Sequence, residues 1–105
     1  MRVLLDECLP RRLARELTGH VVTTVPDAGW AGVSNGTLLA HIAGHYEAFV
    51  TVDKNLPAQQ KLAGLSFGVV VLRAKSNRLD DLRPLVPQLL AALAQMAPGN
   101  VVHVS

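Results

Sequence analysis

Residues 3–12, VLLDECLPRR, pass from an apolar run to two adjacent acids and then to a proline and paired arginines. The apolar run at 3–5 has the composition of a short buried strand, and Pro10 is a residue that commonly opens a helix. A strand followed at once by a helix is the first half of a β-α-β unit, so this stretch favours an α/β fold. It also leaves Asp6 and Glu7 at the end of the strand, where an acid is either a helix cap or part of a functional site.

The composition predicts one compact domain that spans residues 1–105. Half of the residues are hydrophobic and 17% are charged, which suits a single aliphatic core. The formal net charge is +2, and seven of the ten basic residues are Arg, so an anionic partner is compatible with the chain. A single cysteine excludes an internal disulfide framework, and the apolar start is too short for a signal peptide. We therefore expect a cytoplasmic protein with no membrane segment, since no apolar run approaches the ~20 residues that a bilayer requires.

Five runs rich in Val and Leu predict the strands of one sheet. The runs are continuous rather than alternating, as expected when helices cover both faces of the sheet. Because strands and helices alternate, and each parallel pair needs a right-handed crossover, we expect a three-layer fold with a mostly parallel sheet in the order 2-1-3-4-5. The predicted strands are residues 3–5, 21–25, 48–52, 68–72 and 100–104.

Segments with helical spacing separate these strands. Leu9, Leu13 and Leu17 lie on one stripe. Ser34 has the character of an N-cap for the next helix, whose expected apolar face ends with Tyr46. The last and longest stripe predicts a single helix, and its apolar residues are Leu82, Leu85, Val86, Leu89, Leu90 and Leu93.

Polar residues gather at one edge of the predicted sheet. Asp6 ends the first strand, Asp53 ends the third, and Asn35 begins the helix after the second. These side chains are expected to meet, because ligands bind beyond the strand ends where the strand order reverses. Carboxylate and amide oxygens suit Mg²⁺ or Mn²⁺, and such an ion can promote phosphoryl transfer. A second interpretation stays open, in which Asp6 and Asp53 only cap local turns; Glu7 joins the site only if the chain has already turned there.

Basic residues near this edge can meet the phosphates of an anionic partner. Arg11, Arg12 and Lys54 are the candidates, and the alternative is a solvated helix face, which we expect for Arg15. The chain has one Trp, one Tyr and two Phe, too few for the stacking platforms of many RNA-binding proteins. Sequence-specific RNA recognition is therefore not supported.

Four further residues invite a functional interpretation, and we expect a structural role for each. His41 and His45 have a spacing that can hold zinc but lack a third ligand in the pattern. Cys8 is expected to be a small buried filler, and Trp30 is expected to pack against the sheet edge. Apolar loop residues such as Trp30 and Val33 also suggest a homodimer.

The chain resembles a known family over nearly its whole length. The matching pieces are the LLDECLP start, the GWAGVSN segment and the VTVD strand end. They are similar to short bacterial PIN-like domains related to VapC-type toxins and to the Mut7-C proteins. The resemblance implies a PIN-like α/β fold and a metal-dependent ribonuclease, a hydrolase that acts on RNA. It further implies the toxin half of a toxin–antitoxin pair, with a small antitoxin protein as partner.

The resemblance also assigns roles to individual residues. Asp6 and Asp53 match acidic metal-site residues, Glu7 matches an acid of the start motif, and Thr51 matches the threonine of the strand end, which we assign to substrate binding. Asn35 and Asn55 stand where the family usually carries acids. Asn in place of an acid keeps an oxygen ligand but lacks the negative charge, so an ion would be held by fewer carboxylates.

Two functions follow and stay open. In the first, Asp6, Asp53 and Asn35 are catalytic residues of a Mg²⁺- or Mn²⁺-dependent ribonuclease, and Glu7 and Asn55 complete the metal site. In the second, the replacement of acids has weakened catalysis and left a binding or regulatory module. A small-molecule binder is not supported, because the chain has no glycine-rich phosphate loop.

Overall fold

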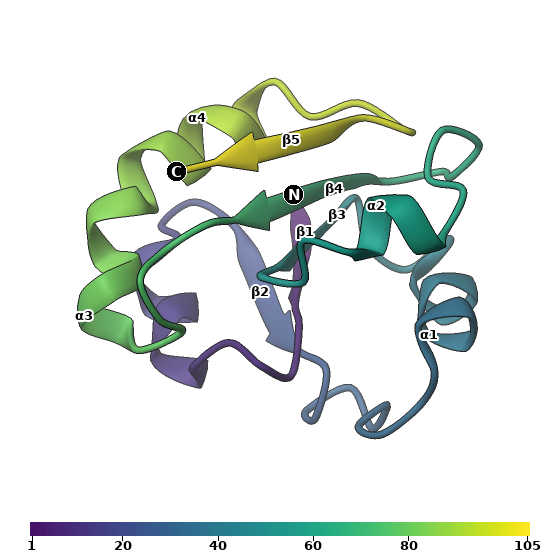
Figure 1. Ribbon diagram of the computed structural model, residues 1–105, viewed down its shortest axis with the longest axis horizontal. Coiled ribbons are helices and arrows are strands. Elements are labelled where there is room, and N and C mark those ends of the chain that lie inside the picture. The colour runs from purple at the N-terminus through teal and green to yellow at the C-terminus, as the bar shows by residue number, and fades with distance from the viewer.

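In the computed structural model of the chain, five parallel strands form one sheet with helices on both faces (Figure 1). The structure describes residues 1–105 apart from the side chain of Gln59. The strand order is β2-β1-β3-β4-β5, and every neighbouring pair is parallel. The predicted fold class and strand order are thus confirmed, and each predicted strand lies within one residue of the observed one. The strands are β1 (Arg2–Leu5), β2 (Val21–Thr24), β3 (Ala48–Thr51), β4 (Gly68–Leu72) and β5 (Val101–Val104).

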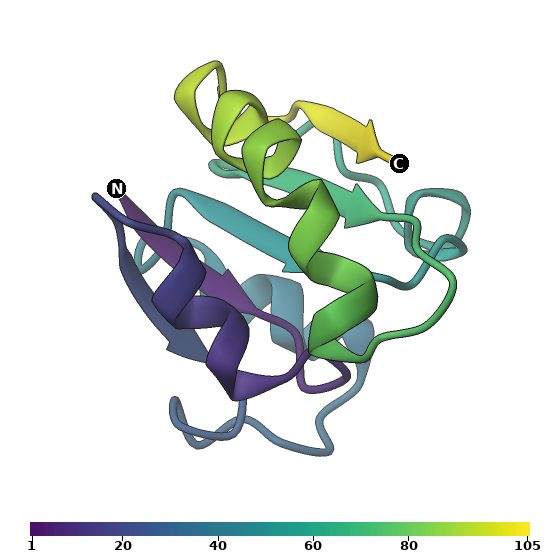
Figure 2. The same ribbon diagram turned by 90° about the vertical axis from the view of Figure 1, so that its left-hand side faces the viewer.

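The two faces of the sheet carry separate hydrophobic cores, because successive side chains of a strand point to opposite faces. In β1, Leu5 faces the first core and Leu4 faces the second. The first core is covered by η1 (Arg11–Glu16) and by the last helical segment, and the second by α1 (Asn35–Ile42) and α2 (Leu56–Gln59) (Figure 2). Burial on both sides explains why the strands are continuous apolar runs.

The helical turn after β1 is a 3₁₀ helix, which follows directly on Pro10. Its bonds span three residues, as in the bond from the Leu13 amide to the Pro10 carbonyl oxygen at 3.0 Å. Leu9, Leu13 and Leu17 are all buried in the first core. The predicted apolar stripe is therefore confirmed. The helix between its ends is a 3₁₀ helix, which is wound more tightly than an α-helix.

The last helical segment consists of three consecutive pieces rather than the single helix that the leucine stripe predicts. They are α3 (Leu79–Leu82), η2 (Arg83–Leu85) and α4 (Val86–Ala94). Pro84 lies in η2 and Pro87 lies at the start of α4. Because proline donates no amide hydrogen, these positions interrupt the α-helical ladder and leave a 3₁₀ turn between the α pieces. None of the described helices is long and apolar enough to span a membrane.

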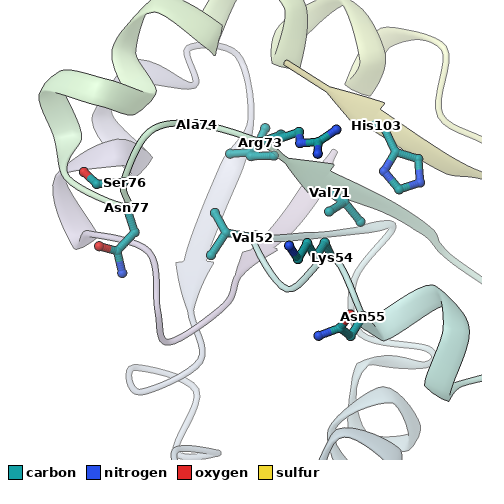
Figure 3. A pocket seen from close by; sticks show the side chains of 10 residues that line it. Val52, Lys54, Asn55, Val71, Arg73, Ala74, Ser76, Asn77 and His103 are labelled. Carbon is teal, nitrogen blue, oxygen red and sulfur yellow. The ribbon is translucent and has the colours of Figure 1, made fainter.

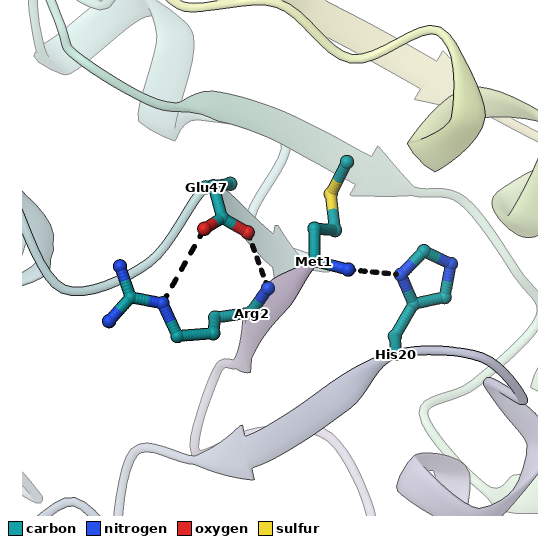
Figure 4. A network of polar contacts seen from close by, with 4 residues as sticks. All are labelled: Met1, Arg2, His20 and Glu47. Carbon is teal, nitrogen blue, oxygen red and sulfur yellow. Dashed lines mark hydrogen bonds and ion pairs between the residues drawn. The ribbon is translucent and has the colours of Figure 1, made fainter.

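A set of polar contacts joins the amino ends of the three neighbouring strands β2, β1 and β3 (Figure 4). The backbone amide of Arg2 donates to Glu47 Oε2, and its guanidinium Nε lies 3.4 Å from Glu47 Oε1. The amino group of Met1 lies 3.4 Å from Nδ1 of His20, just before β2. The amide of Arg2, with its guanidinium, holds the pKa of Glu47 below the ordinary value.

We expect Glu47→Gln to remove a small, pH-dependent contribution to stability. Because the pKa of Glu47 is lower in the folded chain, the carboxylate stabilises the fold above the unfolded Glu value of about 4.3, and this stabilisation is lost as pH falls through the folded value. The side chains of Arg2 and Glu47 are 53% and 47% exposed, so screening keeps the effect near or below about 1 kcal/mol. Urea unfolding at neutral and acid pH measures it. A stability difference that persists unchanged in acid would contradict the assignment.

Candidate functional site

The carboxyl ends of β1 and β3 lie side by side at one edge of the sheet. In the parallel register of these strands, Leu5 pairs with Val50. The amide of Asp6 extends this ladder by donating to the carbonyl oxygen of Val50 at 2.9 Å. Asp6 therefore lies next to Thr51, and Thr51 precedes Asp53 by two residues in the chain.

The hydroxyl group of Thr51 joins the two acidic segments. It is fully buried, donates to Asp6 Oδ2 at 2.6 Å and accepts from the amide of Asp53 at 3.0 Å. Because donor and acceptor functions are both used, the hydroxyl has one preferred orientation and fixes the Asp6 carboxylate against the segment that carries Asp53. The donor function of this hydroxyl and one of its lone pairs are used within the protein, and the role of Thr51 in substrate binding stays a prediction.

Each of the two carboxylates also makes a local turn contact. Asp6 Oδ1 accepts from the amide of Glu7 at 2.8 Å, and Asp53 Oδ1 accepts from the amide of Asn55 at 3.0 Å. These are the bonds that the interpretation as turn caps predicts. They do not exhaust the carboxylates, because each oxygen has two lone pairs, and no hydrogen bond from a described residue reaches Asp53 Oδ2. A capping role and a ligand role are therefore compatible.

Asp6 and Asp53 have the donor chemistry that a hard divalent ion accepts. Both side chains are partly buried. Among the described residues, no cluster of three or more His, Cys, Asp or Glu side chains could hold a metal ion. Mg²⁺ commonly takes one or two protein carboxylates and keeps water at its other positions. The pair thus fits Mg²⁺ or Mn²⁺ as a small donor set.

The other predicted metal ligands lie around this pair at different places. Glu7 is exposed, and its Oε1 lies 3.5 Å from the amide of Gly32, in the loop after β2. Asn55 follows β3 and lines a neighbouring cleft. Asn35 is the first residue of α1, and within the described part of the chain no hydrogen bond joins it to either carboxylate. Their role as ligands stays a prediction.

Cys8 lies beside the acids and packs against the first core. Burial raises the pKa of its thiol, and the charge of Asp6 raises it further. A thiol in this state is protonated at neutral pH and is a poor nucleophile. Cys8 therefore has the packing role expected from the sequence, but it is partly buried rather than buried.

Trp30 packs against the second core, and its ring also contacts aromatic residues of the helical layer. Its ring stacks on His41 with centroids 5.2 Å apart and meets His45 and Tyr46 edge-on at 6.2 and 6.0 Å. The loop turns back onto α1 through glycines with positive φ. Tyr46 lies beyond the end of α1 rather than on its face, and still packs against the second core. Trp30 and Val33, which suggested a homodimer, are partly buried against the same core.

The predicted phosphate-binding residues fall into two groups. Arg11 forms an ion pair with Asp27, with Nη2 2.6 Å from Oδ1, and lines a groove of about 390 Å³ with Arg12 and Arg15. Lys54 lines a separate cleft of about 590 Å³ where β3, β4 and β5 end (Figure 3). Only Lys54 directly follows one of the two acids.

Sequence reasoning missed two basic residues of this cleft, Arg73 and His103. Arg73 directly follows β4, so the rule that selected Asp53 as a residue at a strand end could have found it. His103 lies within β5, and only the strand register places it at the cleft.

The chain matches one known family. The family described as PIN like domain matches residues 1–74, a range that includes β1 to β4 and both acids. Comparisons with curated proteins and with solved structures found no match.

We expect Thr51→Val to destabilise the fold by roughly 1–3 kcal/mol, because a donor to Asp6 and an acceptor for the Asp53 amide are lost from a buried place. Thr51→Ser keeps the hydroxyl and should lose only about 1 kcal/mol with its methyl group. Urea unfolding of both variants measures this difference. Equal losses for Val and Ser would show that the hydroxyl contributes little.

We expect calorimetry to detect Mn²⁺ binding by the wild type and at least about tenfold weaker binding by Asp6→Ala, because one of two carboxylates is removed. Asp80→Ala is the matched control, since Asp80 is an exposed acid in α3. Identical titrations of the wild type and Asp6→Ala would count against a metal site at this edge.

Proposed function

We propose that this chain, which belongs to the PIN-like domain family, is a metal-dependent ribonuclease. The match confirms the resemblance read from the sequence, and the family is one of proposed nucleases whose members typically use divalent metals. The observation that carries the proposal is the link from the Asp6 carboxylate through Thr51 to Asp53 at the carboxyl edge of the sheet. It supports a fixed position for the Asp6 carboxylate next to the segment that carries Asp53.

In this proposal Asp6 and Asp53 hold Mg²⁺ or Mn²⁺, and Asn35 and Asn55 orient water by hydrogen bonds. The ion supplies Lewis-acid stabilisation of the charge that develops on the phosphoryl group during phosphodiester hydrolysis. The chain itself contributes positioning, because β1 and β3 fix the backbone of both acids and Thr51 fixes one carboxylate. A preset arrangement of this kind needs no reorganisation when substrate binds.

We further propose that the chain is a cytoplasmic toxin that a small antitoxin protein neutralises. The support is the resemblance of the LLDECLP start and the VTVD strand end to the proteins related to VapC-type toxins. An adjacent small reading frame in the genome would strengthen this role.

The second candidate is a binding or regulatory module with weak or lost catalysis. It is favoured by the small number of charges, since Asn35 and Asn55 are neutral and no third acid joins Asp6 and Asp53 among the described residues. An ion held by fewer carboxylates is bound more weakly, and catalysis that depends on it falls accordingly.

Cleavage of a labelled single-stranded RNA separates these candidates. We expect cleavage with Mg²⁺ or Mn²⁺ and none with EDTA. Asp6→Asn and Asp53→Asn should each lower the rate by more than about a hundredfold, the most that loss of a residue supporting a metal ligand usually costs. Asp80→Asn removes the charge of an exposed acid in α3 that pairs with Arg83, and it should retain the rate. Intact RNA under all metal conditions, with folded protein, would favour the module.

A further inference from the structure

A basic cleft lies at the carboxyl ends of β3, β4 and β5 (Figure 3). It has a volume of about 590 Å³, within the range of binding clefts for small ligands. Lys54, Arg73 and His103 line it together with the amide side chains of Asn55 and Asn77. Among the described residues that line it, none is acidic and none is Phe, Tyr or Trp.

The cleft adjoins the acid pair. Lys54, which lines it, directly follows Asp53 in the chain. Asn77, on the loop before α3, donates from Nδ2 to the carbonyl oxygen of Cys8 at 2.7 Å. This bond ties the wall of the cleft to the turn directly after β1. A ligand that reaches the two acids can therefore continue into the cleft.

The strand register extends a row of side chains from the acids toward the β5 edge. Thr51 pairs with Val71, and Val71 pairs with His103, so these three side chains lie on one face of the sheet. Arg73 lies two residues beyond Val71 and returns to that face, and its amide donates to the Val104 carbonyl oxygen at 2.8 Å. The row thus begins at the acid pair and ends at two basic residues.

The cations of the cleft have no acidic partner among the described residues. Every ion pair that the described residues form involves Arg2, Arg11 or Arg83, and none of these three lines the cleft. Arg73 and Lys54 are both exposed. Unpaired positive charge in a cleft attracts anions, and the guanidinium fork of Arg matches the oxygens of a phosphate.

We propose that Lys54, Arg73 and His103 bind the phosphate backbone of single-stranded RNA where it crosses the cleft from the acid pair toward β5. The direction of the strand rests on the proposed ribonuclease function, which puts the scissile phosphate at Asp6 and Asp53. Without aromatic residues in the cleft, contacts go to the backbone and carry no sequence preference. Continuity with the acid pair favours RNA over an acidic protein segment.

Fluorescence anisotropy with a labelled single-stranded RNA in EDTA measures this binding without cleavage. Arg73→Ala should weaken binding about fivefold at low salt and reduce the slope of log affinity against log salt by about 0.7, the value for one phosphate contact with a single strand. Arg15→Ala removes the same charge from an exposed residue of η1 outside the cleft and should change neither quantity. Arg73→Lys keeps the charge and should restore the slope.

Equal affinities and salt slopes for Arg73→Ala and Arg15→Ala would overturn the proposal, as would binding of an acidic peptide but not of RNA. Urea unfolding checks that Arg73→Ala remains folded. RNA binding that depends on Arg73, without cleavage under any metal condition, would support the binding track, that is, the RNA path along Lys54, Arg73 and His103. The same result would contradict the proposed nuclease activity. RNA cleavage by the wild type, together with an RNA affinity that Arg73→Ala leaves unchanged, would support the nuclease and contradict the binding track.

Discussion

The hydrogen bond that buried Thr51 donates to the partly buried Asp6 carboxylate is the contact on which the candidate site depends. The parallel ladder between β1 and β3 fixes only the backbone of the strand ends. A carboxylate at a strand end can still rotate, so its direction requires a partner that is itself fixed. Thr51 meets this requirement because the same hydroxyl accepts from the amide of Asp53. Because Thr51 is itself fully buried, its end of both bonds is shielded from water, and hydrogen bonds are stronger in such surroundings.

The sheet was predictable because its strands are short apolar runs with few alternatives. Runs that stay apolar on both faces must lie between two helical layers, and the crossovers then restrict the strand order. The helices were less predictable in type. Leu9, Leu13 and Leu17 all face the core although only Leu13 lies within the 3₁₀ helix, so the apolar pattern does not distinguish this helix from an α-helix. Pro84 and Pro87 decided the form of the last helical segment through missing amide donors, which the leucine stripe does not register.

Site residues that directly follow a strand could be predicted from the sequence. Residues whose position depends on strand register or on the course of a loop could not. Asp6 and Asp53 follow apolar runs directly, so sheet topology alone placed them at one edge. The position of Asn35 depends on a loop turned by glycines with positive φ, whose course spacing cannot give. His103 looks like an exposed strand residue until its pairing with Val71 is known. Tertiary pairing, not residue type, made it part of the cleft.

The two neutral amides and the basic cleft act on the same electrostatic balance. A carboxylate at the edge attracts a divalent ion and repels the phosphates of RNA, so replacing an acid by Asn weakens one effect and relieves the other. Two unit charges 4 Å apart interact by about 1 kcal/mol in water and by about 4 kcal/mol at an effective dielectric constant of 20. The partly buried acid pair lies between these limits, whereas Lys54 and Arg73 are exposed and closer to the weaker one. Under the proposed function, loss of an acid would therefore weaken metal binding more than it strengthens RNA binding, and the cleft would compensate for affinity but not for catalysis.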